Sequence, residues 1–85
     1  MAALFDQIVG EVVPYEQDVE GDTIASVAWS VSPTGPTVTP LANTGTSATA
    51  NFTSSVVGTF VLQCVLTLTT NGQIRKGRAT ISVDP

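Results

Sequence analysis

The side chains that could carry chemistry are few. The chain has no histidine, so the side chain most used for proton transfer near neutral pH is missing, together with any Ser/His or Cys/His nucleophile. Its single cysteine, Cys64, lies on the apolar face of a predicted strand, where a thiol keeps a high pKa and stays inert. We therefore predict no catalytic and no cofactor-binding residue, and a protein that is not an enzyme and has no small-molecule substrate.

Four carboxylates alternate along the N-terminal segment. Glu16, Asp18, Glu20 and Asp22 would share one side of an extended strand and could in principle bind a cation. Calcium loops add a tight glycine turn and a closing bidentate acid at fixed spacing, which these residues do not match. No metal or other cofactor is expected, and we interpret the acids as a solvated strand or a partner-facing edge.

All three bases of the chain are Arg75, Lys76 and Arg78. They make at most a weak phosphate site, and nucleic-acid binding needs a basic stripe that is absent. They are expected to be solvated or to pair with the acidic N-terminal segment, within one chain or between copies. Exposed pairs contribute only about 0–1 kcal/mol each, so they would set partner geometry more than stability.

Between these two groups, from Thr23 to Ile74, the chain carries no charge. An exposed monomer is expected to have a mixed charged surface, whereas a neutral surface can pack on a neighbour without desolvating ions. The 42% hydrophobic residues provide a core, and 85 residues correspond to one domain.

Apolar residues recur at every second position, which is typical of half-buried strands. The pattern is clearest over Thr59–Thr70, and Asn71-Gly72 predicts a two-residue type I′ hairpin loop. This loop would place Leu66 opposite Gly77, Cys64 opposite Ala79, Leu62 opposite Ile81, Phe60 opposite Val83 and Val65 opposite Arg78.

Further strands are predicted over Ala25–Val31, Thr37–Leu41 and Ala48–Phe52, and an extended first strand over Ile8–Val19 is broken by Gly10 and Pro14. The fold class is all-β, an immunoglobulin-like antiparallel β-sandwich of six or seven short strands. In such a sandwich the first strand often lies next to the last, which would allow the acidic and basic segments to pair. Residues 1–20 form an N-terminal arm or first strand and residues 21–85 the sandwich domain. The residues expected to dominate the core are Trp29, Phe52, Phe60, Leu62 and Ile81.

The first residues, Met1 to Asp6, lack the basic leader and apolar run of a signal peptide. No segment approaches the 18 apolar residues of a membrane span. We expect no membrane association and assembly in a cytoplasm. The predicted interface combines the neutral hairpin face with the charged residues at both ends: Val61, Val65, Thr67, Arg75, Lys76, Arg78, Glu16, Asp18 and Glu20.

Three stretches together resemble small immunoglobulin-like structural proteins of tailed bacteriophages, of the fibre-tail adaptor or decoration type. Gly21-Asp22-Thr23-Ile24 followed by Val27–Val31 is similar to their "D-T-I" step before a "W-x-V" strand. Ala48–Phe52, Gly58–Cys64 and Thr69–Gly72 are similar to their "G-T-x-Y-x-V" strand and "T-x-x-G-R" hairpin, although Arg75 is displaced from the position after the turn glycine.

The resemblance covers Gly21 to Val83 and implies a non-catalytic virion protein, assembled in the host cytoplasm. It would decorate the head or adapt the tail, in many copies, by docking on capsid, neck or tail proteins and on copies of itself. The alternative is a PKD-like or bacterial immunoglobulin-like adhesion module that binds a glycan or protein ligand, since "G-T-[FY]-x-[VL]" also occurs there.

Overall fold

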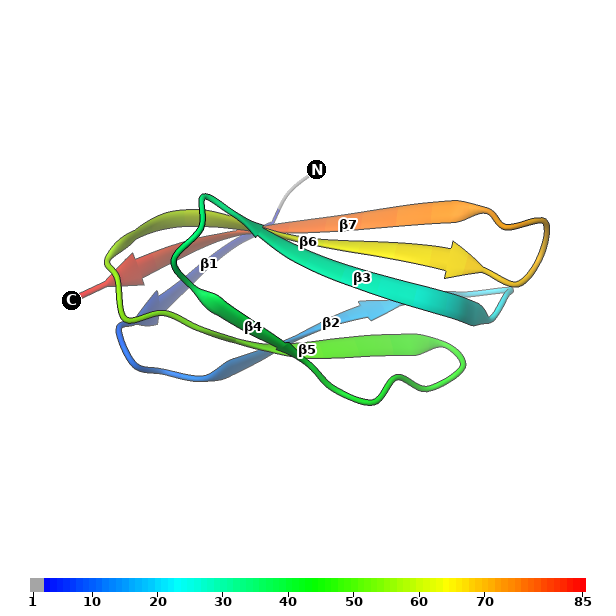
Figure 1. The fold of residues 1–85 in the computed structure, drawn as a ribbon, viewed down its shortest axis with the longest axis horizontal. Helices are drawn as coiled ribbons and strands as arrows, with labels where there is room; N and C mark the ends of the chain where they lie inside the picture. Colours follow the sequence, from blue (N-terminus) through cyan, green and yellow to red (C-terminus); the bar gives the residue numbers. More distant parts are fainter. Residues whose placement is uncertain (1–2) are drawn as a thin grey trace.

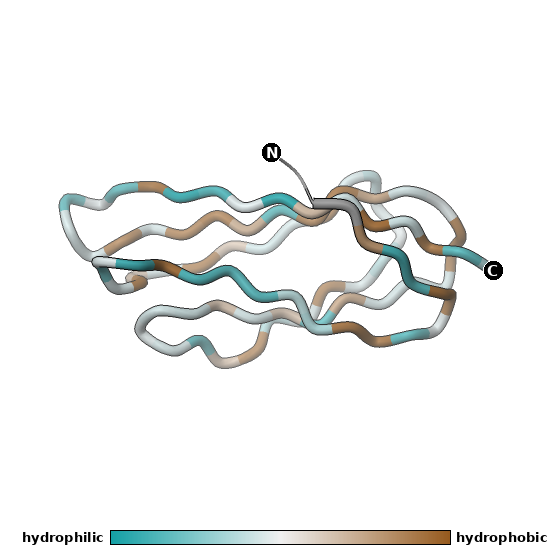
Figure 2. The backbone as a smooth tube through the Cα atoms, turned by 180° about the vertical axis from the view of Figure 1, so that it is seen from behind, coloured by the Kyte–Doolittle hydropathy of each residue, from teal (hydrophilic) through white to brown (hydrophobic). Residues whose placement is uncertain are grey.

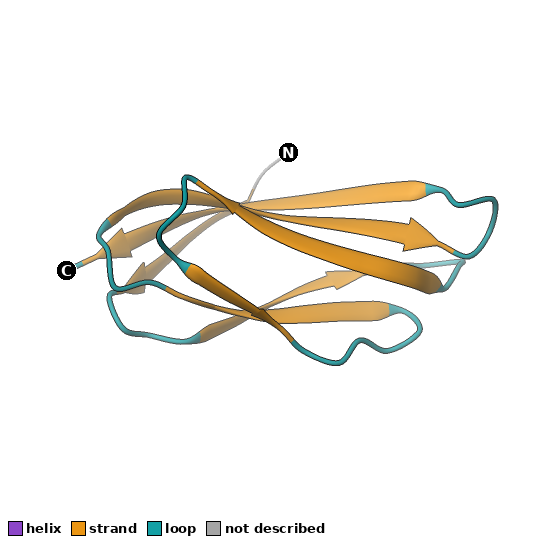
Figure 3. Cartoon of the chain, in the orientation of Figure 1, coloured by secondary structure: helices purple, strands orange, loops and turns teal. Residues whose placement is uncertain are grey.

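The computed structural model describes residues 3–85, with side chains from Phe5 onward, and all regular structure in this part is β (Figures 1 and 3). The strands are β1 (Ala3–Ile8), β2 (Val13–Asp18), β3 (Ile24–Ser32), β4 (Thr37–Pro40), β5 (Ser47–Thr53), β6 (Gly58–Leu68) and β7 (Ile74–Asp84). Over residues 3–85 there is no helix of the length and apolarity that a membrane crossing requires. The all-β class and the upper strand count are confirmed.

The strands form two sheets that pack face to face, one in the order β1-β7-β6-β3 and the other in the order β2-β5-β4 (Figure 1). The first strand lies beside the last, as expected, and this β1–β7 pair is parallel whereas the other pairs are antiparallel. The chain crosses between the sheets after β1, β2, β3 and β5, whereas β4–β5 and β6–β7 are hairpins within one sheet. This is the Greek-key connectivity of an immunoglobulin-type sandwich.

The prediction of one strand over Ile8–Val19 is wrong, because two strands in different sheets occupy this region. β1 ends at Ile8, and Gly10 has φ +88°, a left-handed conformation that turns the chain toward the second sheet. Val9 N–H donates to Asp84 O (2.8 Å) and Gly10 N–H to Ser54 O (3.0 Å), which anchors the crossing. Within residues 1–20, β1 and β2 each join a sheet, while Met1 and Ala2 lie outside the described residues.

The predicted hairpin exists, but its register is shifted by two residues. Asn71 and Gly72 have φ +58° and +62°, as a type I′ turn requires. Leu68 N–H, however, donates to Gln73 O (2.8 Å), so the two threonines before Asn71 leave the ladder and enlarge the loop.

The enlarged loop changes every predicted partner across the hairpin. The observed partners are Leu66–Arg75, Val65–Lys76, Cys64–Gly77, Gln63–Arg78, Leu62–Ala79, Phe60–Ile81 and Gly58–Val83. Because side chains alternate with period two, a shift of two residues preserves the face of every side chain. The predicted faces are therefore correct although the predicted pairs are not.

β3 contains a bulge at its start. Ile24 pairs with Leu68 and Ser26 with Thr67, so Ala25 is the extra residue, and it is exposed although simple alternation with Val27 and Trp29 would place it inward. An extra residue reverses the alternation. Ile24 before the bulge and Val27, Trp29 and Val31 after it therefore all face the core.

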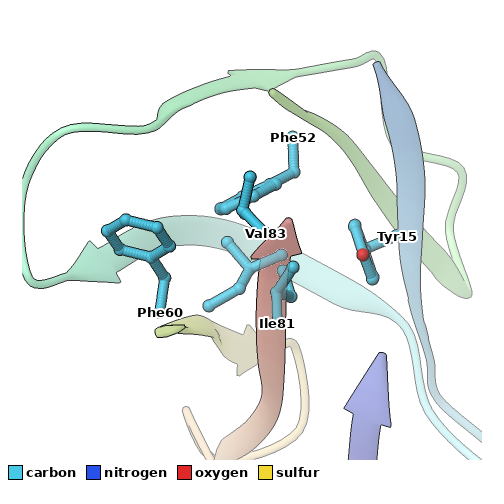
Figure 4. Packing of buried hydrophobic residues seen from close by; sticks show 6 residues of the cluster. Tyr15, Phe52, Phe60, Ile81 and Val83 are labelled. Carbon is cyan, nitrogen blue, oxygen red and sulfur yellow. The ribbon is translucent and has the colours of Figure 1, made fainter. Parts of the chain in front are cut away.

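The core contains two adjoining clusters of buried side chains. One combines Tyr15, Phe52, Phe60, Leu62, Ile81 and Val83 from both sheets (Figure 4), and the other Val19, Ala48, Cys64, Leu66 and Leu68. Phe52, Phe60, Leu62 and Ile81 are buried as predicted. Trp29 is only partly buried, because β3 is the edge strand of its sheet, but it packs against both clusters and bridges them.

Candidate interaction surfaces

The structure gathers five of the predicted interface residues on the outer face of the four-stranded sheet. Val61, Val65 and Thr67 alternate on β6 with buried residues, and Lys76 is the cross-strand partner of Val65. Arg78 lies beside Gln63, and its Nε donates to Gln63 Oε1 (3.3 Å). Val61 is 37% exposed, so a valine stripe with two cations beside it faces outward.

Arg75 does not join this surface. Its partner is the buried Leu66, which places Arg75 on the inner side of the sheet, near the hairpin turn where the sandwich ends. The three bases lie within four positions of β7 but are divided between its two faces.

The acidic residues lie on the opposite side of the molecule. Glu16 and Asp18 alternate on β2 with inward-facing Tyr15 and Gln17, so they belong to the outer face of the second sheet. Asp18 accepts a hydrogen bond from Ser47 Oγ (2.6 Å), and Glu20 follows the strand in an exposed turn. Figure 2 shows the hydrophilic stretches of β2 and of early β7 in different sheets. The predicted interface is thus two surfaces, one basic and one acidic, on opposite outer faces of one domain.

Asp22 has a structural role that the sequence pattern did not indicate. Its Oδ1 accepts hydrogen bonds from Thr23 N (2.7 Å), Thr69 Oγ1 (2.9 Å) and Thr70 Oγ1 (3.1 Å). These bonds, with that from Thr23 N the strongest influence, lower the pKa of the Asp22 carboxyl. The carboxylate ties the β2–β3 turn to the β6–β7 hairpin.

A cleft of about 360 Å³ opens between the edge of β2 and the stretch of β7 that β1 does not cover. Its lining includes Phe5, Gln17, Trp29 and Gly77. The Gln17 amide lies where a side chain at Gly77 would be, so the absence of a Cβ there lets β2 approach β7. Sequence reasoning did not find this cleft, because it depends on which strands face each other across the two sheets.

A buried polar pair closes the neighbouring end of the sandwich. Tyr15 Oη donates to Gln7 Oε1 (3.0 Å), and Gln7 Nε2 donates to the Glu11 carbonyl (3.3 Å). Gln7 is 4% exposed. Burial, and secondarily the Glu11 carboxylate, raises the pKa of Tyr15, which keeps the hydroxyl protonated as a donor.

The thiol of Cys64 lies in the core. Cys64 is 2% exposed, and burial raises the pKa of its thiol to about 11, so the reactive thiolate is scarce at neutral pH. Among residues 3–85 no group of three or more His, Cys, Asp or Glu side chains could hold a metal ion.

Comparison with known proteins identifies the fold. No family model matches the sequence, and no curated protein matches it. Among solved structures, the titin M3 domain superposes with a TM-score of 0.67 at 17% identity, over 99% of this chain and 90% of that one. The endo-fucoidan hydrolase MfFcnA4_H294Q of glycoside hydrolase family 107 gives 0.58 at 17% identity, over 95% of this chain but 12% of the enzyme. The protein therefore has an immunoglobulin-like β-sandwich fold, as predicted.

Proposed function

We propose that this protein is a non-catalytic structural component of a tailed-phage virion, which acts by docking on other virion proteins and on copies of itself. An immunoglobulin-like sandwich suits an interaction module, although a fold alone does not define a function. The sequence resemblance over Gly21–Val83 supplies the virion context, as head decoration or tail adaptor.

The observation that carries the docking proposal is the outer face of β3 and β6. Its side chains are Ser26, Ala28, Ser30 and Ser32 on β3 and Val61, Gln63, Val65 and Thr67 on β6, without a charge. Such a surface can lie against a neighbour without the desolvation of ions, and its valines supply apolar contact. The cations of β7 border it on one side.

The test is incorporation of variants into particles. Val61→Lys and Val65→Lys place a charge on the proposed docking face at side chains that are not in the core, so the purified domains should keep the wild-type melting temperature within a few degrees. We expect both variants to be absent from purified virions, measured by mass spectrometry and cryo-electron microscopy. Thr37→Lys, at an exposed position of the other sheet, is the matched control and should incorporate normally. Normal incorporation of both valine variants would refute this docking face, and absence of the wild-type chain from virions would refute the virion role.

One observation favours the alternative, an adhesion or accessory module that binds a glycan or protein ligand. The similar structure in the endo-fucoidan hydrolase is a small part of a much larger chain, as expected of a module appended to another protein. A glycan array and a pull-down test this alternative. No ligand above background in either assay would count against it.

A further inference from the structure

Three of the four sheet edges carry features that discourage strand pairing. β4 is short, with Pro40 at its end, and β2 carries Pro14 and two acids. On the remaining side of the large sheet, β1 covers β7 only from Ala79 onward, and the uncovered stretch Ile74–Arg78 holds every base of the chain. Proline, charge and short length are the features by which natural sheets block edge-to-edge association.

The fourth edge has none of these features, and its one bulge, at Ala25, lies before the stretch Ser26–Ser32. β3 extends from Ile24 to Ser32 without a charge or a proline, and no strand lies beyond it in its sheet among residues 3–85 (Figure 1). A long neutral edge strand offers a row of main-chain donors and acceptors to an added strand.

The hydrogen bonds at the end of the sheet show which groups face outward. Leu68 N–H donates toward β7, to Gln73 O, and Thr69 N–H donates toward β3, to Thr23 O. Because main-chain groups alternate in direction along a strand, the odd-numbered residues of β6 face β3 and bond to Ser26, Ala28, Ser30 and Ser32. The N–H and C=O groups of Val27, Trp29 and Val31 therefore face the open edge.

We propose that β3 of a second copy of this chain pairs antiparallel with this edge, around a two-fold axis at Trp29. In that register Trp29 faces Trp29 of the second copy, and Val27 faces Val31, so the outward donors and acceptors of both copies are matched. Ser26, Ala28, Ser30 and Ser32 on the outer face are small and uncharged, which permits close approach. The proposal extends the docking function but does not depend on the virion assignment.

The edge favours a second copy over an unrelated segment because it is self-complementary. A two-fold contact uses the same patch on both subunits, and this patch has neither like charges to repel nor bulky outer side chains to clash. Val27, Trp29 and Val31 are partly buried in the isolated chain, so pairing would cover more of their apolar surface. Homodimer interfaces are more apolar than other contacts in this way.

Disulfide trapping tests the register. The pairing places Ala28 opposite Ser30 of the second copy as a non-hydrogen-bonded pair, about 4.5 Å apart at Cα, within the range that a disulfide spans. Equal positions of the two copies, 28 with 28 or 30 with 30, would be about 8 Å apart, beyond that range. We expect an oxidised mixture of Ala28→Cys and Ser30→Cys chains to form covalent dimers at least about tenfold faster than either chain alone.

A matched control uses Lys76→Cys mixed with Ala28→Cys, since position 76 is exposed on the same outer face but lies on β7, two strands from the edge. This mixture should not cross-link, and the buried Cys64 should not react in any sample. A mixture of 28 and 30 that cross-links no faster than its separate components or than this control would overturn the register.

Sedimentation tests the association itself. The wild-type chain should show a concentration-dependent monomer–dimer equilibrium. Val31→Pro removes an outward N–H without touching the ladder to β6, so it should weaken association at least about tenfold. A wild-type chain that stays monomeric up to millimolar concentration would overturn the proposal. The edge would then be open to a strand from another protein instead of a second copy. A folded Val31→Pro chain that dimerises as wild type would also overturn the proposal. A dimer that never enters virions would instead refute the proposed function alone.

Discussion

The bond between Tyr15 and Gln7 joins the two sheets, because Tyr15 is on β2 and Gln7 on β1. Tyr15→Phe removes the hydroxyl and leaves Gln7 Oε1 without its donor at a side chain that is 4% exposed. An unsatisfied buried acceptor costs about 1–3 kcal/mol. The whole domain is expected to be stable by about 4–13 kcal/mol at this length, so the loss is a substantial fraction.

A double-mutant cycle separates this loss from general packing. Gln7→Met keeps the side-chain length and removes the amide, which leaves the Tyr15 hydroxyl without its acceptor. Changing both residues removes donor and acceptor together, and such replacements are nearly neutral when shape is conserved. We expect the double variant to be more stable than the sum of the single losses predicts, by about 1 kcal/mol or more.

The measurement is urea unfolding at neutral pH, followed by the fluorescence of Trp29, with the m-value checked for each variant. Above pH 10 the wild type should also lose stability, because the pKa of Tyr15 is higher in the folded than in the unfolded chain. The contribution of the protonated hydroxyl to stability is complete below the pKa of the unfolded chain and disappears as the pH rises through the pKa of the folded one. Tyr15→Phe should lack this component. Additive single losses, or a Tyr15→Phe cost below about 0.5 kcal/mol, would refute the role of the buried pair.

Three further predictions concern other parts of the fold. Cys64 should react with a thiol reagent at pH 8 only as fast as the domain unfolds, and rapid labelling of native protein would contradict its burial. The free energy of unfolding should also fall between pH 9 and about 11, because the thiol ionises there in the unfolded chain but not in the folded one. The pKa of Asp22 is lowered, so the contribution of its carboxylate to stability should be complete above the pKa of the unfolded chain and lost as the pH falls through the pKa of the folded one. Asp22→Asn should lack this part of the acid destabilisation, and identical acid unfolding of variant and wild type would contradict the role of the carboxylate. Gly72→Ala should cost about 1–2 kcal/mol in urea unfolding because φ is +62°, whereas Gly45→Ala, at a glycine without positive φ, should cost less, and equal costs would argue against the turn geometry.

The strand faces could be predicted because alternation is a local property of the sequence. Ala48, Ala50 and Phe52 on β5 are buried as their spacing indicated, and so are the even-numbered residues of β6 from Phe60 to Leu68. Period two depends only on neighbouring residues in the same strand, so the inward faces of both strands were correct.

The hairpin register could not be predicted because its determinant is distant in sequence. Asp22 accepts hydrogen bonds from Thr69 and Thr70, and Thr69 N–H donates to Thr23 O, so both hydroxyl residues are held by the β2–β3 turn rather than paired with β7. A local turn motif at Asn71-Gly72 contains no information about that contact.

The division of the predicted interface residues between two outer faces could not be predicted for a similar reason. Charge and spacing showed that Glu16 and Lys76 are exposed, but not that β2 and β7 belong to different sheets. The cleft beside Gly77 and the bulge at Ala25 likewise depend on tertiary packing, which a single sequence pattern does not specify.

The parallel pairing of β1 with β7 determines how the domain would carry a pulling force. Ala3, at the start of β1, pairs with Ala79, and Ile8, at the end of β1, pairs with Asp84 near the end of β7. A force that separates the two chain ends therefore acts along both strands in opposite directions, and it loads the hydrogen bonds of this pair in shear and all at once instead of one after another. If the domain is held at both ends between larger assemblies, rupture should begin only when the whole β1–β7 ladder gives way.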